Sequence, residues 1–157
     1  MFAASSEFVA FLRAAKLATY AAQGDDATVL PLLPDSKQLE YSREPYLYRD
    51  AYVGTLRFAG QEIVYFEGRA VWSMAYSGGL VAGVAKTEAA QTYRVLRMAL
   101  SAVPAALPLR GPSAFESEGL RYTCSPSGAL ERFQGQESIV RQGSALYELQ
   151  FTGGVLA

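Results

Sequence analysis

A short motif occurs twice in this 157-residue chain, and it constrains the fold more than any other feature. RFAGQE at residues 57–62 returns as RFQGQE at residues 132–137, a shift of 75 positions. The likeness extends without a gap over residues 57–79 and 132–154, where nine of 23 positions are identical. Repetition of one unit at a fixed spacing is typical of internal duplication, and two copies can share one core around an approximate two-fold axis. The sequence therefore predicts a single domain, residues 1–157, that contains this internal repeat.

Each half of the chain contains a helical pattern followed by strand patterns. Apolar side chains recur at helical spacing from Ser6 onwards, and a second helical pattern runs from Thr87 until Pro104 stops it. Strict alternation over residues 70–77 and 145–152 predicts strands with one buried face. We expect an α+β fold: an internally duplicated helix-plus-antiparallel-hairpin unit, with a curved antiparallel sheet of about six to eight strands packed by two helices.

The chain contains no histidine and a single cysteine, Cys124. Histidine is the usual general base near neutral pH and the usual zinc ligand, so we expect no His-dependent triad, no metal centre and no cofactor. The 14 basic and 15 acidic residues nearly cancel, so no summed field draws the chain towards nucleic acid or an anionic membrane. No signal-peptide pattern and no apolar run of roughly 18 to 20 residues occurs. These features predict a cytoplasmic protein without direct nucleic-acid or membrane contacts.

The segment LEYSREPYLYRDAY, residues 39–52, concentrates tyrosines and charges. On a strand, Tyr48, Asp50 and Tyr52 share one face, and Arg49 lies on the other. Tyrosines beside arginine and aspartate can line a pocket for a planar or polar ligand, and they can equally form the rim of a core with satisfied hydroxyls. The residues alone leave both interpretations open.

In the order LEY, YLYRDAYVG, RFAGQEIVYFEGRAVWSMAYSG and LPLRGP, the sequence resembles a bacterial and archaeal family known only as a domain of unknown function. The pattern Tyr-x-Tyr-Arg-Asp-x-Tyr precedes Phe-x-Gly-x-Glu and Val-Trp-x-Met-x-Tyr, and the resemblance covers nearly the whole chain. Members resemble stand-alone proteins of this length or the C-terminal half of regulators with an N-terminal helix-turn-helix, which implies that the domain senses something. The positions that match the family are Glu40, Tyr41, Tyr48, Arg49, Asp50, Tyr52, Phe58, Gly60, Glu62, Trp72, Tyr76, Arg110 and Gly111. Ala75 departs from it, because an amide is commoner there.

We predict a ligand-binding site centred on the Tyr-Arg-Asp strand. Arg49 or Arg110 would hold an anionic or amide group, and the tyrosines would wall the pocket. The predicted ligand-binding residues are Glu40, Tyr48, Arg49, Asp50, Tyr52, Glu62, Trp72 and Arg110. No residue is assigned a catalytic or metal-binding role.

Three functions fit these observations. The leading one is a non-enzymatic ligand-sensing or protein-interaction domain, with a small molecule and a homodimer or protein partner as its expected contacts. The second is a histidine-independent lyase, isomerase or carboxylate hydrolase that acts through Tyr, Asp and Glu. Two such side chains within hydrogen-bond reach in a pocket, one with a strongly raised pKa, would favour this enzyme. The third is a purely structural protein-binding module, which an exposed apolar patch without a concave site would favour.

Overall fold

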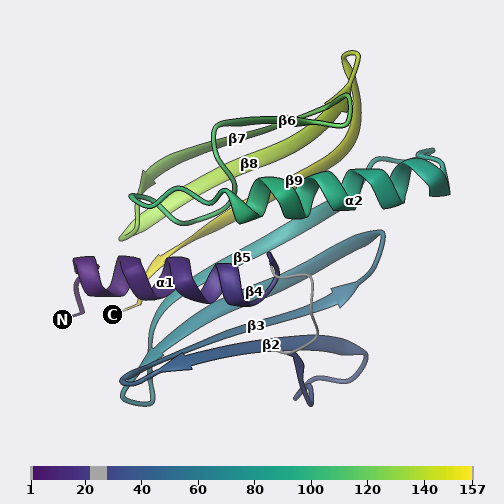
Figure 1. Ribbon diagram of the computed structural model, residues 1–157. Coiled ribbons are helices and arrows are strands. Elements are labelled where there is room, and N and C mark those ends of the chain that lie inside the picture. Colours follow the sequence, from purple (N-terminus) through teal and green to yellow (C-terminus); the bar gives the residue numbers. More distant parts are fainter. Residues whose placement is uncertain (1, 22–27, 157) are drawn as a thin grey trace.

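The computed structural model describes residues 2–21 and 28–156, in which one antiparallel sheet of nine strands carries two helices on one face (Figure 1). The strand order is β1-β2-β3-β4-β5-β9-β8-β7-β6. Chain neighbours are therefore sheet neighbours everywhere except in the middle, where β5 pairs with β9. Strands β1–β5 and β6–β9 form the two halves of the sheet.

Each half of the sheet is preceded by a helix. Helix α1 spans Ser6–Ala18 and helix α2 spans Lys86–Ser101. The strands of the first half are β1 (Thr28–Val29), β2 (Ser36–Arg43), β3 (Tyr46–Gly54), β4 (Arg57–Phe66) and β5 (Arg69–Leu80). The strands of the second half are β6 (Ala114–Ser117), β7 (Leu120–Ala129), β8 (Arg132–Arg141) and β9 (Ser144–Val155).

The predicted α+β fold with six to eight strands packed by two helices is wrong, because the described residues are mostly sheet and form nine strands. The edge strands β1 and β6 are two and four residues long. Runs this short carry too little alternation to be seen in a sequence. Strand β2 is also difficult to recognise in the sequence, because its side chains alternate between buried and exposed only in part.

The two helices begin with different caps. The Ser5 side chain accepts a 3.2 Å hydrogen bond from the backbone nitrogen of Phe8 at the start of α1. At α2 the cap residue is Ala85, and its backbone nitrogen donates instead to the Glu88 carboxylate at 3.4 Å. In the described part of the chain, no helix is long and apolar enough to cross a membrane.

The two halves of the sheet have matching registers. Arg57 pairs with Gly79 across β4 and β5, and Arg132 pairs with Gly154 across β8 and β9. Both hairpins also contain a register shift at equivalent positions. The halves meet where β5 and β9 pair antiparallel, so an approximate two-fold axis passes through the centre of the sheet.

The repeated glycine of the motif makes room for an aromatic ring from the neighbouring strand. Gly60 pairs with Tyr76, and a Cβ at Gly60 would lie 2.5 Å from the Tyr76 hydroxyl. Gly135 pairs with Phe151, and a Cβ there would lie 2.4 Å from the Phe151 ring. Such distances are far below van der Waals contact, so only glycine fits beneath each ring. The motif recurs because both halves use the same close approach of ring to backbone.

Candidate functional site

The sheet has one face under the helices, the covered face, and an opposite open face. Tyr48, Asp50 and Glu62 are 1%, 3% and 3% exposed and lie on the covered face. Arg49 points to the open face, where its Nε donates a 2.7 Å hydrogen bond to Glu40. Six of the eight predicted residues lie on the covered face or in the segment packed against it: Tyr48, Asp50, Tyr52, Glu62, Trp72 and Arg110. The other two, Glu40 and Arg49, lie on the open face.

Glu62 is paired with a buried cation from helix α1. The Lys16 ammonium lies 2.5 Å from the Glu62 carboxylate, and the two side chains are 9% and 4% exposed. Burial lowers the pKa of Lys16, while the Glu62 charge opposes that shift. Burial raises the pKa of Tyr48 well above its usual value, and Glu62 raises it further. These groups are satisfied by one another and form part of the core.

Glu137, the counterpart of Glu62, is held by three side chains. Arg110, which follows helix α2, donates to it through Nε at 3.1 Å and through Nη2. The hydroxyls of Tyr122 and Tyr147 donate to the same carboxylate at 2.6 Å and 2.8 Å. Burial lowers the pKa of Arg110, but the charge and hydrogen bond of Glu137, together with Tyr147 and Tyr122, leave that pKa well above its usual value. Glu137 therefore anchors Arg110 in the covered face.

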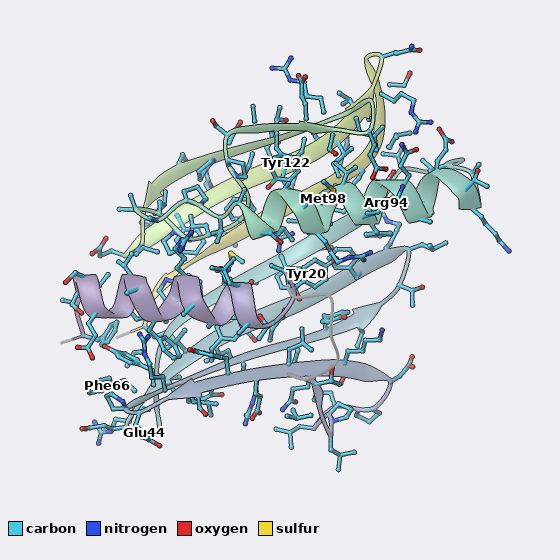
Figure 2. The ribbon with its side chains drawn as sticks, viewed as in Figure 1. Tyr20, Glu44, Phe66, Arg94, Met98 and Tyr122 are labelled. Carbon is cyan, nitrogen blue, oxygen red and sulfur yellow. The ribbon has the colours of Figure 1, made fainter. Side chains whose placement is uncertain are left out.

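A cavity of about 270 Å³, the α2 pocket, lies between helix α2 and strands β2–β5 on the covered face. Its aromatic lining consists of Tyr20, Tyr52, Phe58, Tyr76 and Tyr93. Its charged lining consists of Lys37, Asp50, Arg97 and Arg110, and Gly54 and Thr55 complete the rim. Figure 2 shows Tyr20 just beyond the end of α1, above the strands of the first half.

Asp50 is the buried carboxylate of the α2 pocket. The Tyr76 hydroxyl donates a 2.6 Å hydrogen bond to its Oδ1, and Glu62 is its cross-strand partner. Burial raises the pKa of Asp50 to about 7, and the Glu62 charge adds to this, although the hydrogen bond from Tyr76 lowers it. Asp50 therefore exchanges its proton near neutral pH. This property allows it to accept a hydrogen bond, donate one or transfer a proton.

The domain described as Domain of unknown function (DUF5680) matches residues 50–156. The chain belongs to this family. No curated protein and no solved structure matches the chain. Asp50, Tyr76 and Arg110 lie within the matched part of the DUF5680 domain, whereas Lys37 and Tyr20 lie before it.

The second half of the DUF5680 domain lacks the polar pair of the first. Cys124 faces the repeated glutamate across β7 and β8, in the position that Asp50 takes in β3 and β4. Phe151 replaces Tyr76 and cannot donate a hydrogen bond. The equivalent position is therefore apolar.

The second half also fills the space that the α2 pocket leaves open. Phe58 of the first half is only partly buried and lines the pocket. Its counterpart Phe133 is 3% exposed and stacks on Trp72, with ring centroids 5.6 Å apart. Trp72 also donates a 3.1 Å hydrogen bond to the Leu130 carbonyl. Trp72, a predicted ligand-binding residue, thus packs in the core and is not part of the pocket lining.

A wider hollow of about 690 Å³ lies on the open face of the DUF5680 sheet, over β5 and β7–β9. Neutral polar side chains such as Ser77, Ser125, Gln136 and Gln150 line it, and they are exposed. Among the described residues, no charged side chain lines this hollow. We place the candidate site in the smaller α2 pocket, because buried ionisable groups and aromatic rings converge there.

Metal binding has no obvious place in the described residues. Across residues 2–21 and 28–156, no group of three or more His, Cys, Asp or Glu side chains is arranged to hold a metal ion. The described lining of the α2 pocket offers instead one carboxylate, three cations and aromatic surfaces. Its chemistry is hydrogen bonding, ion pairing, ring packing and proton transfer.

Several residues that line the α2 pocket are not among the predicted ligand-binding residues. Tyr76 and Phe58 match the family pattern, but the sequence alone does not indicate that they contact a ligand. Tyr93 and Arg97 are four residues apart on α2, a spacing that puts both on one side of a helix, and this was an available signal. Nothing local to Lys37 distinguishes it from an ordinary surface lysine.

Proposed function

We propose that this DUF5680 domain binds a small organic ligand in the α2 pocket and acts as a non-enzymatic, cytoplasmic sensing module. The observation that carries the proposal is the convergence of Asp50, Arg97 and Arg110 on one concave, aromatic-walled cavity. Binding sites are typically concave and largely apolar, with a few polar groups that fix the ligand's orientation. A volume of about 270 Å³ lies just below the range of drug-sized ligands, roughly 300 to 1,000 Å³, so it suits a small metabolite.

The sensing role is supported by which elements form the pocket. Tyr93 and Arg97 come from α2, whereas Asp50 and Tyr76 come from the central strands. A ligand that contacts both would favour the arrangement in which α2 is held against the sheet. The resemblance to domains that follow a helix-turn-helix fits this role, because a conformational change on ligand binding can shift the conformational equilibrium of a domain joined to it. The DUF5680 domain itself would make no direct contact with nucleic acid.

A thermal-shift screen against a broad metabolite library tests the binding function. A ligand at about 100 times its dissociation constant stabilises the folded state by roughly 2.7 kcal/mol. We expect hits whose stabilisation is lost in Asp50→Asn and Arg97→Gln, while Arg49→Ala on the open face retains it. Hits that survive both pocket substitutions would contradict the assignment of the site, and a library without any hit would contradict the function.

A second candidate function is acid–base catalysis, and the Asp50–Tyr76 pair favours it. The two groups lie 2.6 Å apart in a pocket, and the pKa of Asp50 is raised by burial to about 7. A base is most effective when its pKa lies near the working pH. Asp50 could take a proton from a carbon beside a carbonyl and return it to another carbon of the same substrate. Such an isomerisation leaves the proton count unchanged and needs no cofactor.

Deuterium exchange separates the two functions. A ligand found in the screen would be incubated with the protein in D₂O and followed by proton NMR. Loss of a carbon-bound proton signal with wild type, but not with Asp50→Asn, would assign the domain as an enzyme. Retention of every carbon-bound proton, with binding intact, would favour the sensing function.

A further inference from the structure

The charges of the α2 pocket differ from those of the whole chain. The chain has a formal net charge of −1, yet among the described residues three cations and one carboxylate line the pocket. Arg110 is neutralised by Glu137. In the described part of the chain, neither Lys37 nor Arg97 takes part in a salt bridge. Two cations at the pocket thus have no charged partner among the described side chains.

The deep end of the pocket presents one acceptor to a ligand. Asp50 is 3% exposed, and the hydrogen bond from Tyr76 reaches its Oδ1. The Asp50 carboxylate also lines the pocket, so a ligand group that donates to it forms a hydrogen bond shielded from bulk water, where such a bond is stronger than at an exposed surface.

We infer that the α2 pocket takes a small planar organic carboxylate, with its carboxylate at Arg97 and Lys37 and a hydroxyl or amino group at Asp50. This inference rests on the proposed binding function and specifies its ligand class. Arg97 is partly buried and Lys37 exposed, so the cationic end faces the solvent side of the pocket, while Asp50 lies deep. The flat part of the ligand then packs against the rings of Phe58 and Tyr93, which line the pocket.

Other charge types fit the same pocket less well. A cationic ligand would face the positive charges of Lys37 and Arg97, against the single described carboxylate of Asp50. A neutral ligand would leave the Arg97 guanidinium partly desolvated and unpaired, whereas a carboxylate can bind an arginine through two parallel hydrogen bonds. Asp50 repels an anion less than an ordinary carboxylate does, because burial raises its pKa to about 7 and it is partly protonated at neutral pH.

A matched series of probes tests the ligand class by calorimetric titration at pH 7. The probes are 4-hydroxyphenylacetate, its neutral amide, tyramine as the cation, and phenylacetate, which lacks the hydroxyl donor. We expect 4-hydroxyphenylacetate to bind at least roughly tenfold more tightly than the amide, tyramine and phenylacetate. Where this scaffold is not the natural one, the hits of the library screen are ranked by charge and must be predominantly planar carboxylates.

Substitutions assign the two ends of the ligand. Arg97→Gln should weaken the binding of 4-hydroxyphenylacetate roughly tenfold and leave the affinity for its neutral amide unchanged. Arg94→Gln is the matched control, because Arg94 is on the same helix (Figure 2) but pairs with Glu118 outside the pocket. Asp50→Asn should reduce the advantage of 4-hydroxyphenylacetate over phenylacetate.

The outcomes distinguish this inference from the function on which it rests. If neutral or cationic compounds bind most tightly, and their binding is lost in Arg97→Gln or Asp50→Asn, the binding function stands and the carboxylate class is overturned. If no probe and no library compound binds in a way that depends on these residues, the binding function itself is overturned.

Discussion

The hydroxyl of Tyr76 lies 2.6 Å from Oδ1 of Asp50, and the two residues are only 7% and 3% exposed. The contact joins β5 to β3 across the intervening strand β4, over the repeated Gly60. It places a carboxyl group that titrates near neutral pH at the inner end of the α2 pocket. The stability of the fold and the chemistry of the site therefore depend on the same pair.

Replacing Asp50 by Asn should change how stability depends on pH. The pKa of Asp50 is about 7 in the folded protein, against 3.8 as the ordinary value. Between these values the folded state holds a proton that the unfolded state has released, so stability falls as pH rises. The slope from this one group is at most about 1.4 kcal/mol per pH unit, and it levels off above pH 7. Asn has no such proton.

Urea denaturation of wild type and Asp50→Asn at pH 5, 6, 7 and 8 measures this effect. The stability of the variant relative to wild type should increase from pH 5 to pH 7 and then remain constant. Titrating groups that do not interact with Asp50 are shared by the two proteins and cancel in the difference. A difference that does not vary with pH would show that Asp50 titrates near its ordinary value.

Gly60→Ala should disturb the Asp50–Tyr76 pair directly. The new Cβ would lie 2.5 Å from the Tyr76 hydroxyl and 2.7 Å from the Ala51 carbonyl oxygen, so the ring must move. We expect a loss of roughly 1 to 3 kcal/mol in the free energy of unfolding, as for other overpacked positions. The pH-dependent difference attributed to Asp50 should also change.

Gly135→Ala provides the matched control for this substitution. Its Cβ would lie 2.4 Å from the Phe151 ring, so the destabilisation should be similar. Phe151 has no hydroxyl, and the pH dependence and ligand affinity should remain those of wild type. Equal effects of both substitutions on pH dependence would argue against a specific contribution of Gly60.

Arg110→Met should be among the most destabilising single changes. It leaves the Glu137 carboxylate buried with only the hydroxyls of Tyr122 and Tyr147 as donors. Loss of one partner of a buried ion pair costs roughly 3 to 5 kcal/mol. Adding Glu137→Gln should recover part of that loss, and denaturation of the single and double variants forms a double-mutant cycle.

Arg121→Met serves as the control for removing an arginine. Its contact with Glu116 is 3.8 Å long, and the two side chains are 60% and 73% exposed. An exposed pair of this kind contributes less than about 1 kcal/mol. A comparable loss for Arg110→Met would mean that Glu137 is accessible to water in solution.

Trp72→Phe should affect stability but not ligand binding. The smaller ring loses the 3.1 Å hydrogen bond to the Leu130 carbonyl and leaves space beside Phe133. An unpaired buried carbonyl and a partial cavity together cost roughly 2 to 4 kcal/mol. Because Trp72 does not line the α2 pocket, the dissociation constant of a pocket ligand should stay within about twofold. A larger change in affinity would extend the site into the core.

The sequence indicates which face of β3 each side chain takes, because alternation along a strand depends only on local geometry. It does not indicate which neighbours form a site. Arg49 and Asp50 are adjacent in the motif, yet the strand sends them to opposite faces, so a motif can join residues that the fold separates. The contributions of Tyr93 and Arg97 depend on how α2 crosses the sheet. That crossing follows from packing between distant segments, which no local pattern contains.

The axis between β5 and β9 brings Tyr76 directly opposite its counterpart Phe151. An internally duplicated chain could contain two equivalent binding sites. Here the position of the second site is filled by the packed rings of Phe133, Phe151 and Trp72. Saturation should therefore be reached at one ligand molecule for each chain, and a titration would show a single class of sites. The half with Phe151 uses this position for core packing, whereas the half with Tyr76 places a hydrogen-bonded polar pair beside a pocket.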